Sequence, residues 1–198
     1  MENLNNNENI DKKEISKETQ KDRKKKRFLH TLKSEVLEWI FYIIICLTLA
    51  ILINNTLIIN ANVPTGSMEN TIPTKSRLFG NRLSYINKSP ERGDIVIFWA
   101  PEENNVLYVK RVIGMPNDVV EIKDGVLYIN GEVYEEDYIK NMSGTWEPFN
   151  VPEGKYFVLG DNRDNSHDAR YWKDPYISKD DIIAKAIIMY WPRIEILK

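Results

Sequence analysis

The stretch VVEIKDGVLYINGEVY, residues 119–134, decides the fold of the longer part of the chain. Its β-branched and aromatic residues predict strands at 119–123 and 126–129, separated by Asp124-Gly125. A two-residue hairpin turn needs positive φ angles, which glycine adopts without steric cost. Asn130-Gly131 repeats this signal before a third short strand at 132–134. The stretch therefore predicts a β-meander.

Beyond the apolar run at 36–59, the sequence on both sides of this meander predicts more strands and no long helix. Apolar, β-branched runs occur at 94–99, 106–113, 156–159 and 182–191, and Pro192 ends the last of them. Residues 135–152 and 161–181 are predicted to be loops, with a helical turn after Ser178. The predicted fold class is mostly β: an N-terminal transmembrane helix followed by a compact, antiparallel β-rich domain.

One apolar run, Val36 to Ile59, is long enough to cross a bilayer, which needs about 20 apolar residues. Glu38 and Asn54-Asn55 are its only strongly polar positions. A buried helix of a soluble protein is the rival interpretation, but such a helix is usually apolar on one face only. A cleavable signal peptide is disfavoured, because no small-x-small site closes the run.

The predicted domains are a disordered basic tail at 1–35, a transmembrane anchor helix at 36–60 and an extracytoplasmic β domain at 61–198. The tail has almost no large apolar groups to bury. Its segment KDRKKKR, residues 21–27, contains six basic residues and one acid directly before the apolar run. Basic residues in this position favour a cytoplasmic N-terminus. We therefore expect a single-pass protein of the cell membrane.

Composition excludes several classes of function. The net charge of −2 provides no general basic field for nucleic acid, although a solvated or nucleic-acid-binding tail is the alternative interpretation of the basic segment. The single cysteine, Cys46, lies in the apolar run, so no disulfide within the chain and no thiolate metal cluster can form.

Ser67, in the polar segment VPTGSM (residues 63–68) just after the apolar run, is a candidate nucleophile. A serine hydroxyl attacks efficiently only when a base takes its proton. The chain has two histidines, and His30 precedes the apolar run, on the opposite side of the membrane if the topology holds. His167 lies in a very polar loop, so a triad of Ser67, His167 and an aspartate is one alternative.

Lys110 is the other candidate base. It lies within YVKRVIG, residues 108–114, where strand alternation would group it with Tyr108 and Val112. A lysine has a pKa of about 10.4, which burial among apolar residues lowers by several units. The residues alone also allow an exposed lysine on the solvent face of a strand, and they favour that interpretation.

Four motifs occur in a fixed order: PTGSMENT at 64–71, GDIV at 93–96, YVKRVIGMPND at 108–118 and GDNRDNSHDAR at 160–170. Together they resemble the bacterial type I signal peptidases, in the compact single-span form common in Gram-positive bacteria. The resemblance covers about residues 36–192.

This resemblance implies a role for each matched residue. Ser67 is the nucleophile and Lys110 the general base. The Thr65 hydroxyl and the Ser67 backbone N–H are oxyanion donors. Ser166 orients the lysine, and Asp168 supports that loop through Arg170 or Arg111. The residues expected to form shallow apolar substrate pockets are Val63, Met68, Ile72, Tyr108 and Val109. No metal or organic cofactor is implied.

The implied activity is that of a membrane-bound serine endopeptidase. It would remove N-terminal signal peptides from secreted precursor proteins after small-x-small sites, through an acyl-enzyme. The implied partners are membrane-held precursors and the lipid bilayer, not nucleic acid. A self-cleaving repressor, a distant serine–lysine relative, would need a DNA-binding segment and no span. A membrane-anchored scaffold with a decayed site would have lost one of the four groups Ser67, Thr65, Lys110 and Ser166.

Overall fold

The structure is a computed structural model that describes residues 35–103, 105–139 and 141–197. The basic segment 21–27, His30 and the predicted disorder of the tail lie outside the described residues. The chain divides into two compact units, Met1–Leu52 and Ile53–Lys198.

The predicted span is a helix over Glu35–Thr56, 22 residues, whose length and composition suffice to cross a membrane. Its side chains are exposed on all sides, and the Thr48 hydroxyl donates to the Ile44 carbonyl at 2.8 Å. The helix ends before the predicted boundary. Ile58 and Ile59 instead begin a strand, because from there apolar residues alternate with asparagines, the two-residue period of a half-buried strand.

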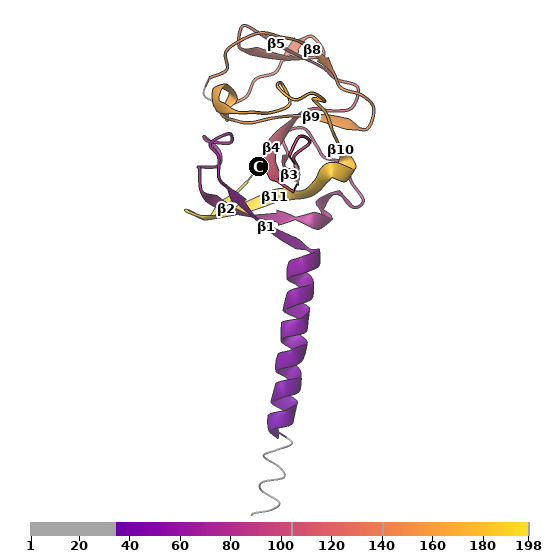
Figure 1. Cartoon of the computed structure of the whole chain (residues 1–198), viewed down its shortest axis with the longest axis vertical. Coiled ribbons are helices and arrows are strands. Elements are labelled where there is room, and N and C mark those ends of the chain that lie inside the picture. The colour runs from indigo at the N-terminus through magenta and orange to yellow at the C-terminus, as the bar shows by residue number, and fades with distance from the viewer. Residues whose placement is uncertain (1–34, 104, 140, 198) are drawn as a thin grey trace, which may run out of the picture. The chain divides into compact units, whose positions relative to one another are not determined.

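The larger sheet contains eight antiparallel strands (Figure 1). Its strand order is β1-β2-β11-β3-β4-β9-β10, and β12 pairs with β11. The strands are β1 Ile58–Val63, β2 Ser76–Asn81, β3 Ile95–Trp99, β4 Leu107–Gly114, β9 Lys155–Leu159, β10 Ile177–Ser178, β11 Ile182–Trp191 and β12 Glu195–Ile196.

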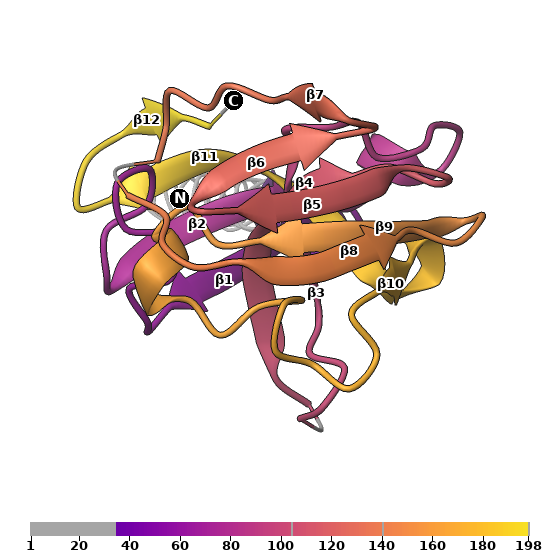
Figure 2. The same ribbon diagram turned by 90° about the horizontal axis from the view of Figure 1, so that it is seen from above.

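The smaller sheet has the order β7-β6-β5-β8 and lies over β9 and β4 in Figure 2. Its strands are β5 Val119–Lys123, β6 Val126–Ile129, β7 Glu132–Val133 and β8 Trp146–Asn150. Both predicted hairpins are confirmed, since Asp124-Gly125 has φ angles of 49° and 76° and Asn130-Gly131 has 55° and 84°.

Two strands lie in segments that were predicted to be loops: the two-residue β10 lies in the predicted loop 161–181, and a longer strand lies in the other. Strand β8 lies inside the predicted loop 135–152. It is a mostly exposed edge strand containing Pro148, which is where sheets tolerate proline. The helical turn after Ser178 is confirmed as a 3-10 turn over Lys179–Asp181, closed by a capping box. The other 3-10 turns are Arg82–Tyr85 and Arg163–Asn165.

Strands β3 and β4 are covered on both faces. Val96 and Phe98 of β3 belong to the apolar cluster beneath the smaller sheet, whereas Ile95 and Ile97 belong to the cluster shared with β1, β2 and β11. A polar side chain on β4 from Val109 onward is therefore buried whichever way it points.

Candidate active site

Ser67 lies in a tight turn after β1. Backbone N–H groups of Thr71 and Ile72 donate to the Met68 carbonyl at 3.1 and 2.7 Å, and that of Glu69 donates to the Gly66 carbonyl at 3.0 Å. Met68 and Ile72 are fully buried and hold the turn against the core. Ser67 itself is only 6% exposed.

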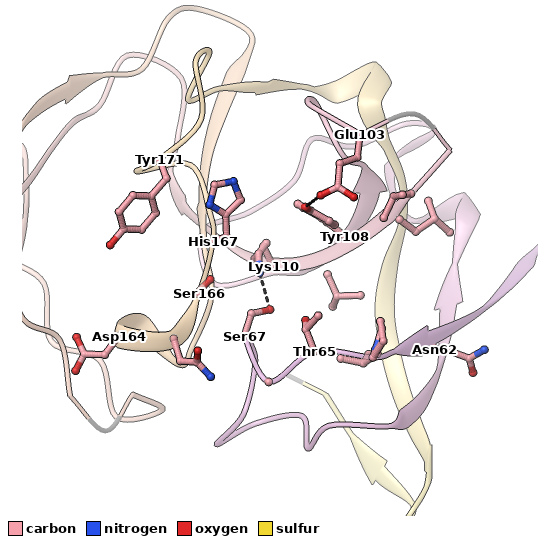
Figure 3. Close-up of a pocket in the computed structure, with 17 residues that line it drawn as sticks. Asn62, Thr65, Ser67, Glu103, Tyr108, Lys110, Asp164, Ser166, His167 and Tyr171 are labelled. Carbon is pink, nitrogen blue, oxygen red and sulfur yellow. Dashed lines mark hydrogen bonds between the residues drawn. The ribbon is translucent and has the colours of Figure 1, made fainter.

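Lys110 lies in the middle of β4, opposite Val96 of β3. It is 4% exposed, because both faces of this part of the sheet are covered. Its Nζ donates a hydrogen bond of 2.5 Å to Ser67 Oγ (Figure 3), from a position 43 residues further along the chain. Nζ also lies 5.6 Å from the centre of the Tyr108 ring.

Burial lowers the pKa of Lys110 from its ordinary 10.5 to about 8. Desolvation is the main cause; the charge of Asp168 opposes it, that of Arg170 adds to it, and that of Asp161 opposes it. At pH 7 a lysine with this pKa is neutral in about one molecule in ten, compared with far fewer for an exposed lysine. This pKa therefore makes Lys110 competent as a base near neutral pH.

His167, the other candidate base, lines the same cavity but has different partners. Its Nε2 lies 3.6 Å from a Glu102 carboxylate oxygen, and its ring stacks on Tyr171 with 5.9 Å between centroids. Its side chain is 59% exposed. In Figure 3 it lies at the cavity rim, on the far side of Lys110 from Ser67.

Thr65 and Ser166 flank the Ser67–Lys110 contact and both line the cavity (Figure 3). Ser166 is 6% exposed. Its hydroxyl has no hydrogen-bond partner within the described part of the chain. The predicted bond from Ser166 to the lysine is therefore not formed in this structure.

Asp168 is fully buried and supports the loop that carries Ser166. Arg170 Nε donates to Asp168 Oδ1 at 2.8 Å, and the Gly160 N–H donates to its Oδ2 at 3.0 Å. Of the two arginines expected as partners, Arg170 is the one that pairs with Asp168. Arg111 instead forms a two-pronged ion pair with Asp161, at 2.9 and 2.7 Å.

The cavity around these groups has a volume of about 710 Å³. Of the expected substrate-pocket residues, Val63, Tyr108 and Val109 line it. Met68 and Ile72 do not line it, because both are completely buried in the core beneath the turn. Several further lining residues had no predicted role. Asn62, Glu103, Val106 and Tyr171 lie outside the four motifs, and Asp164 lies in the last motif but was assigned no part in the site.

Among the described residues, no group of three or more His, Cys, Asp or Glu side chains is arranged to hold a metal ion.

Comparison with known proteins identifies the family. The family model described as signal peptidase, peptidase S26, matches residues 36–191. Signal peptidase I of Bacillus licheniformis is 39% identical over 178 residues, covering 84% of this chain and 94% of that protein. A probable signal peptidase I-2 of Synechocystis is 35% identical over 136 residues, covering 66% of this chain and 62% of that protein. A solved signal peptidase I from Enterococcus faecalis is 36% identical, covers 50% of this chain and 97% of that structure, and has a TM-score of 0.42.

The antiparallel β fold and the family match together define the class of protein, a serine endopeptidase. The chain belongs to the signal peptidase family, peptidase S26. This membership confirms the resemblance drawn from the four motifs, and the apolar helix at its N-terminal side is consistent with a membrane anchor.

Proposed function

We propose that this enzyme removes N-terminal signal peptides from secretory precursors with Ser67 as nucleophile and Lys110 as general base. The observation that carries the proposal is the buried 2.5 Å contact between Lys110 Nζ and Ser67 Oγ. The lowered pKa of Lys110 supports the same roles, because a base must be neutral to accept a proton.

The reaction proceeds in two stages. When Lys110 is neutral, the Ser67 hydroxyl donates to its amine, which takes the proton as Ser67 Oγ attacks the scissile carbonyl. The resulting ammonium gives that proton to the leaving amine, and an acyl-enzyme on Ser67 remains. Lys110 then takes a proton from the water that attacks this ester and returns it to Ser67 Oγ as the acyl–oxygen bond breaks, which releases the carboxylic acid and restores the hydroxyl and the neutral amine.

Thr65 and Ser166 have supporting roles. The Thr65 hydroxyl and the Ser67 backbone N–H donate to the oxyanion, and a donor of this kind typically contributes about 3 kcal/mol. The buried, unpartnered hydroxyl of Ser166 can accept from the Lys110 ammonium and orient it. Asp168 holds the Ser166 loop through Arg170 and Gly160.

The precursor binds as an extended strand between the two chain segments that line the cavity, residues 62–66 and 106–109. Val63 and Val109 form shallow apolar pockets that admit the small residues of a small-x-small site, with Tyr108 beside them. Met68 and Ile72 do not contact the precursor. They are buried in the core and support the turn that carries Ser67.

A cleavage assay tests the dyad. The full-length enzyme in detergent is given a precursor with an Ala-x-Ala site, and Ser67→Ala and Lys110→Ala are compared with the parent. Ser89→Ala and Lys88→Ala, at exposed positions outside the cavity, are the matched controls. We expect the first pair to abolish cleavage and the controls to retain it. Cleavage by either variant of the first pair at the parent rate would disprove the dyad.

We also propose that the anchor helix, Glu35–Thr56, places the tail in the cytoplasm and the catalytic domain outside the cell. Anchoring confines enzyme and precursor to one surface, which raises their effective concentration. Because Cys46 is the only cysteine, a Cys46→Ala chain permits labelling of single cysteines. A membrane-impermeant maleimide should label Glu153→Cys, an exposed position, in intact cells. Lys25→Cys should react only after permeabilisation; the opposite pattern would contradict this topology.

A further inference from the structure

The segment between β7 and β8, two strands of the smaller sheet, contacts the loop that follows β9. Four residues of this segment contact side chains beside the catalytic centre. They are called here the strap residues: Glu136, Tyr138, Met142 and Ser143. None of them lies in the four motifs, and none lines the cavity.

Glu136 forms the most buried of these contacts. Its Oε1 accepts from Arg163 Nη2 at 2.5 Å, and the two side chains are 2% and 0% exposed. The Tyr138 hydroxyl donates to the same oxygen. Arg163 in turn donates through Nε to the Gly160 carbonyl at 3.0 Å. Because a buried guanidinium without its carboxylate is strongly unfavourable, Glu136 sets where Arg163 lies.

Tyr138 contacts a second arginine. The guanidinium carbon of Arg111 lies 3.9 Å from the centre of the Tyr138 ring, a distance at which cation–π attraction is strong for a desolvated pair. The same guanidinium forms the ion pair with Asp161. Tyr138 therefore covers the Arg111–Asp161 pair and keeps water from it.

The remaining strap contacts hold the same loop. The Ser143 N–H and hydroxyl both donate to Asp164 Oδ1, at 2.9 and 2.8 Å. The Met142 sulfur accepts from Arg163 Nη1 at 3.4 Å.

The loop held by these contacts is hydrogen-bonded to the turn that carries Ser67. Asn162 lies between Asp161, which pairs with Arg111, and Arg163, which pairs with Glu136. Its backbone N–H donates to the Ser67 carbonyl at 3.0 Å, and its side-chain amide donates to the Gly66 carbonyl at 2.9 Å. A displacement of residues 161–163 is transmitted directly to Ser67 by these two bonds.

We propose that Glu136 and Tyr138 are positioning residues for catalysis: through Arg163 and Arg111 they hold Asn162 in the place from which it orients the Ser67 turn. The inference rests on the proposed roles of Ser67 and Lys110. Substitution of a residue that only stabilised the fold would lower the free energy of unfolding and leave turnover by the folded enzyme unchanged.

Two variants test the proposal. Glu136→Gln removes the charge opposite Arg163, and Tyr138→Phe removes the hydroxyl that donates to Glu136. The matched control is Tyr85→Phe, which removes another buried tyrosine hydroxyl that donates to a carboxylate, that of Asp94 at 2.8 Å. All are full-length enzymes in detergent, assayed at a temperature at which near-UV circular dichroism shows the parent signal.

For both strap variants we expect kcat to fall at least about tenfold with KM within about twofold, because a shift of about 1 Å at a reacting group costs about a hundredfold. Tyr85→Phe should match the parent. The proposal is overturned if both strap variants keep kcat within about twofold of the parent, or if Tyr85→Phe loses as much. Should Glu136→Gln not fold, Tyr138→Leu, which removes both the hydroxyl that donates to Glu136 and the ring that contacts Arg111, decides the outcome with Tyr138→Phe.

Ser67→Ala, assayed in parallel, distinguishes a failure of the proposed function from a failure of the positioning role alone. If Ser67→Ala still cuts the precursor, the proposed function fails. If Ser67→Ala is inactive while the strap variants turn over like the parent, only the positioning role of Glu136 and Tyr138 fails.

Discussion

Gly160 lies directly against Ser67: a Cβ atom at position 160 would be 2.4 Å from the Ser67 carbonyl oxygen and 2.2 Å from Ser166 Oγ. Such distances are too short for a non-bonded carbon and oxygen, so one of the two groups would have to shift. Glycine at this position is therefore what allows the loop after β9 to approach the nucleophile turn.

Gly160→Ala should reduce kcat by about a hundredfold, because the methyl group must displace Ser67 or Ser166 by roughly 1 Å. Single-turnover kinetics with an Ala-x-Ala precursor measure this loss. Gly131→Ala is the control, since nothing lies within 4 Å of its Cβ position and its φ of +84° affects only the hairpin turn. A Gly160→Ala enzyme with parent kcat would show that the loop does not constrain Ser67.

Activity should depend on pH through Lys110. Only the neutral amine accepts the Ser67 proton, and its pKa is about 8. We expect kcat/KM to rise about tenfold per pH unit below about pH 8 and to level off above it. A pH series with a soluble precursor peptide checks this limb. A limb near the ordinary histidine value of about 6.5 would contradict a lysine base and favour His167.

Lys110→Met should inactivate the enzyme but stabilise the fold at pH 7. The pKa of Lys110 is lower in the folded than in the unfolded chain, so the unfolded chain binds more protons between about pH 8 and 10.5 and stability rises with pH over that window. Below it, burial of the ammonium costs about 3 kcal/mol, partly offset by about 1 kcal/mol from its hydrogen bond to Ser67.

Urea unfolding at pH 7 should therefore give the methionine variant a free energy of unfolding higher by about 2 kcal/mol. This advantage should shrink as the pH approaches 10. An equal or lower stability of Lys110→Met at pH 7 would show that the amine is not desolvated.

Asp168→Asn should destabilise the enzyme by about 3–5 kcal/mol, because it leaves the Arg170 guanidinium buried without its counter-charge. Both side chains of this pair are 0% exposed. Chemical unfolding measures the loss. Glu195→Gln breaks the surface pair with Arg193, in which the side chains are 57% and 40% exposed, and should change stability by less than about 1 kcal/mol. Equal effects of the two substitutions would be inconsistent with this account.

Val109→Ala and Met68→Ala should have different consequences, although both residues were predicted to form substrate pockets. Val109 lines the cavity, so its truncation should relax cleavage toward precursors with a larger residue in place of alanine. Met68 is fully buried outside the cavity, so its truncation should cost about 2–5 kcal/mol of stability and leave specificity unchanged. Competition between Ala-x-Ala and Val-x-Ala precursors, with unfolding curves for each variant, distinguishes them.

Local chemistry explains which elements could be predicted. The turns at Asp124-Gly125 and Asn130-Gly131 need positive φ, and the sequence supplies residues that adopt it. Strand β8 was missed because it is an exposed edge strand containing Pro148, with little apolar alternation to mark it. The end of the helix was misplaced because Ile58 and Ile59 are as apolar as the helix itself, and only their pairing with β2 makes them a strand.

The amino-acid sequence by itself determined the hairpins, the apolar helix and the order of the four motifs, because each depends on residues adjacent in the chain. Whether Lys110 is exposed or buried was left open, and only the tertiary structure decided it. Packing covers both faces of β3 and β4, so the lysine loses its water. The same holds for its contact with Ser67, 43 residues away, and for the approach of Glu136 to Arg163. Such contacts arise from long-range strand pairing and loop packing, for which no short sequence pattern exists.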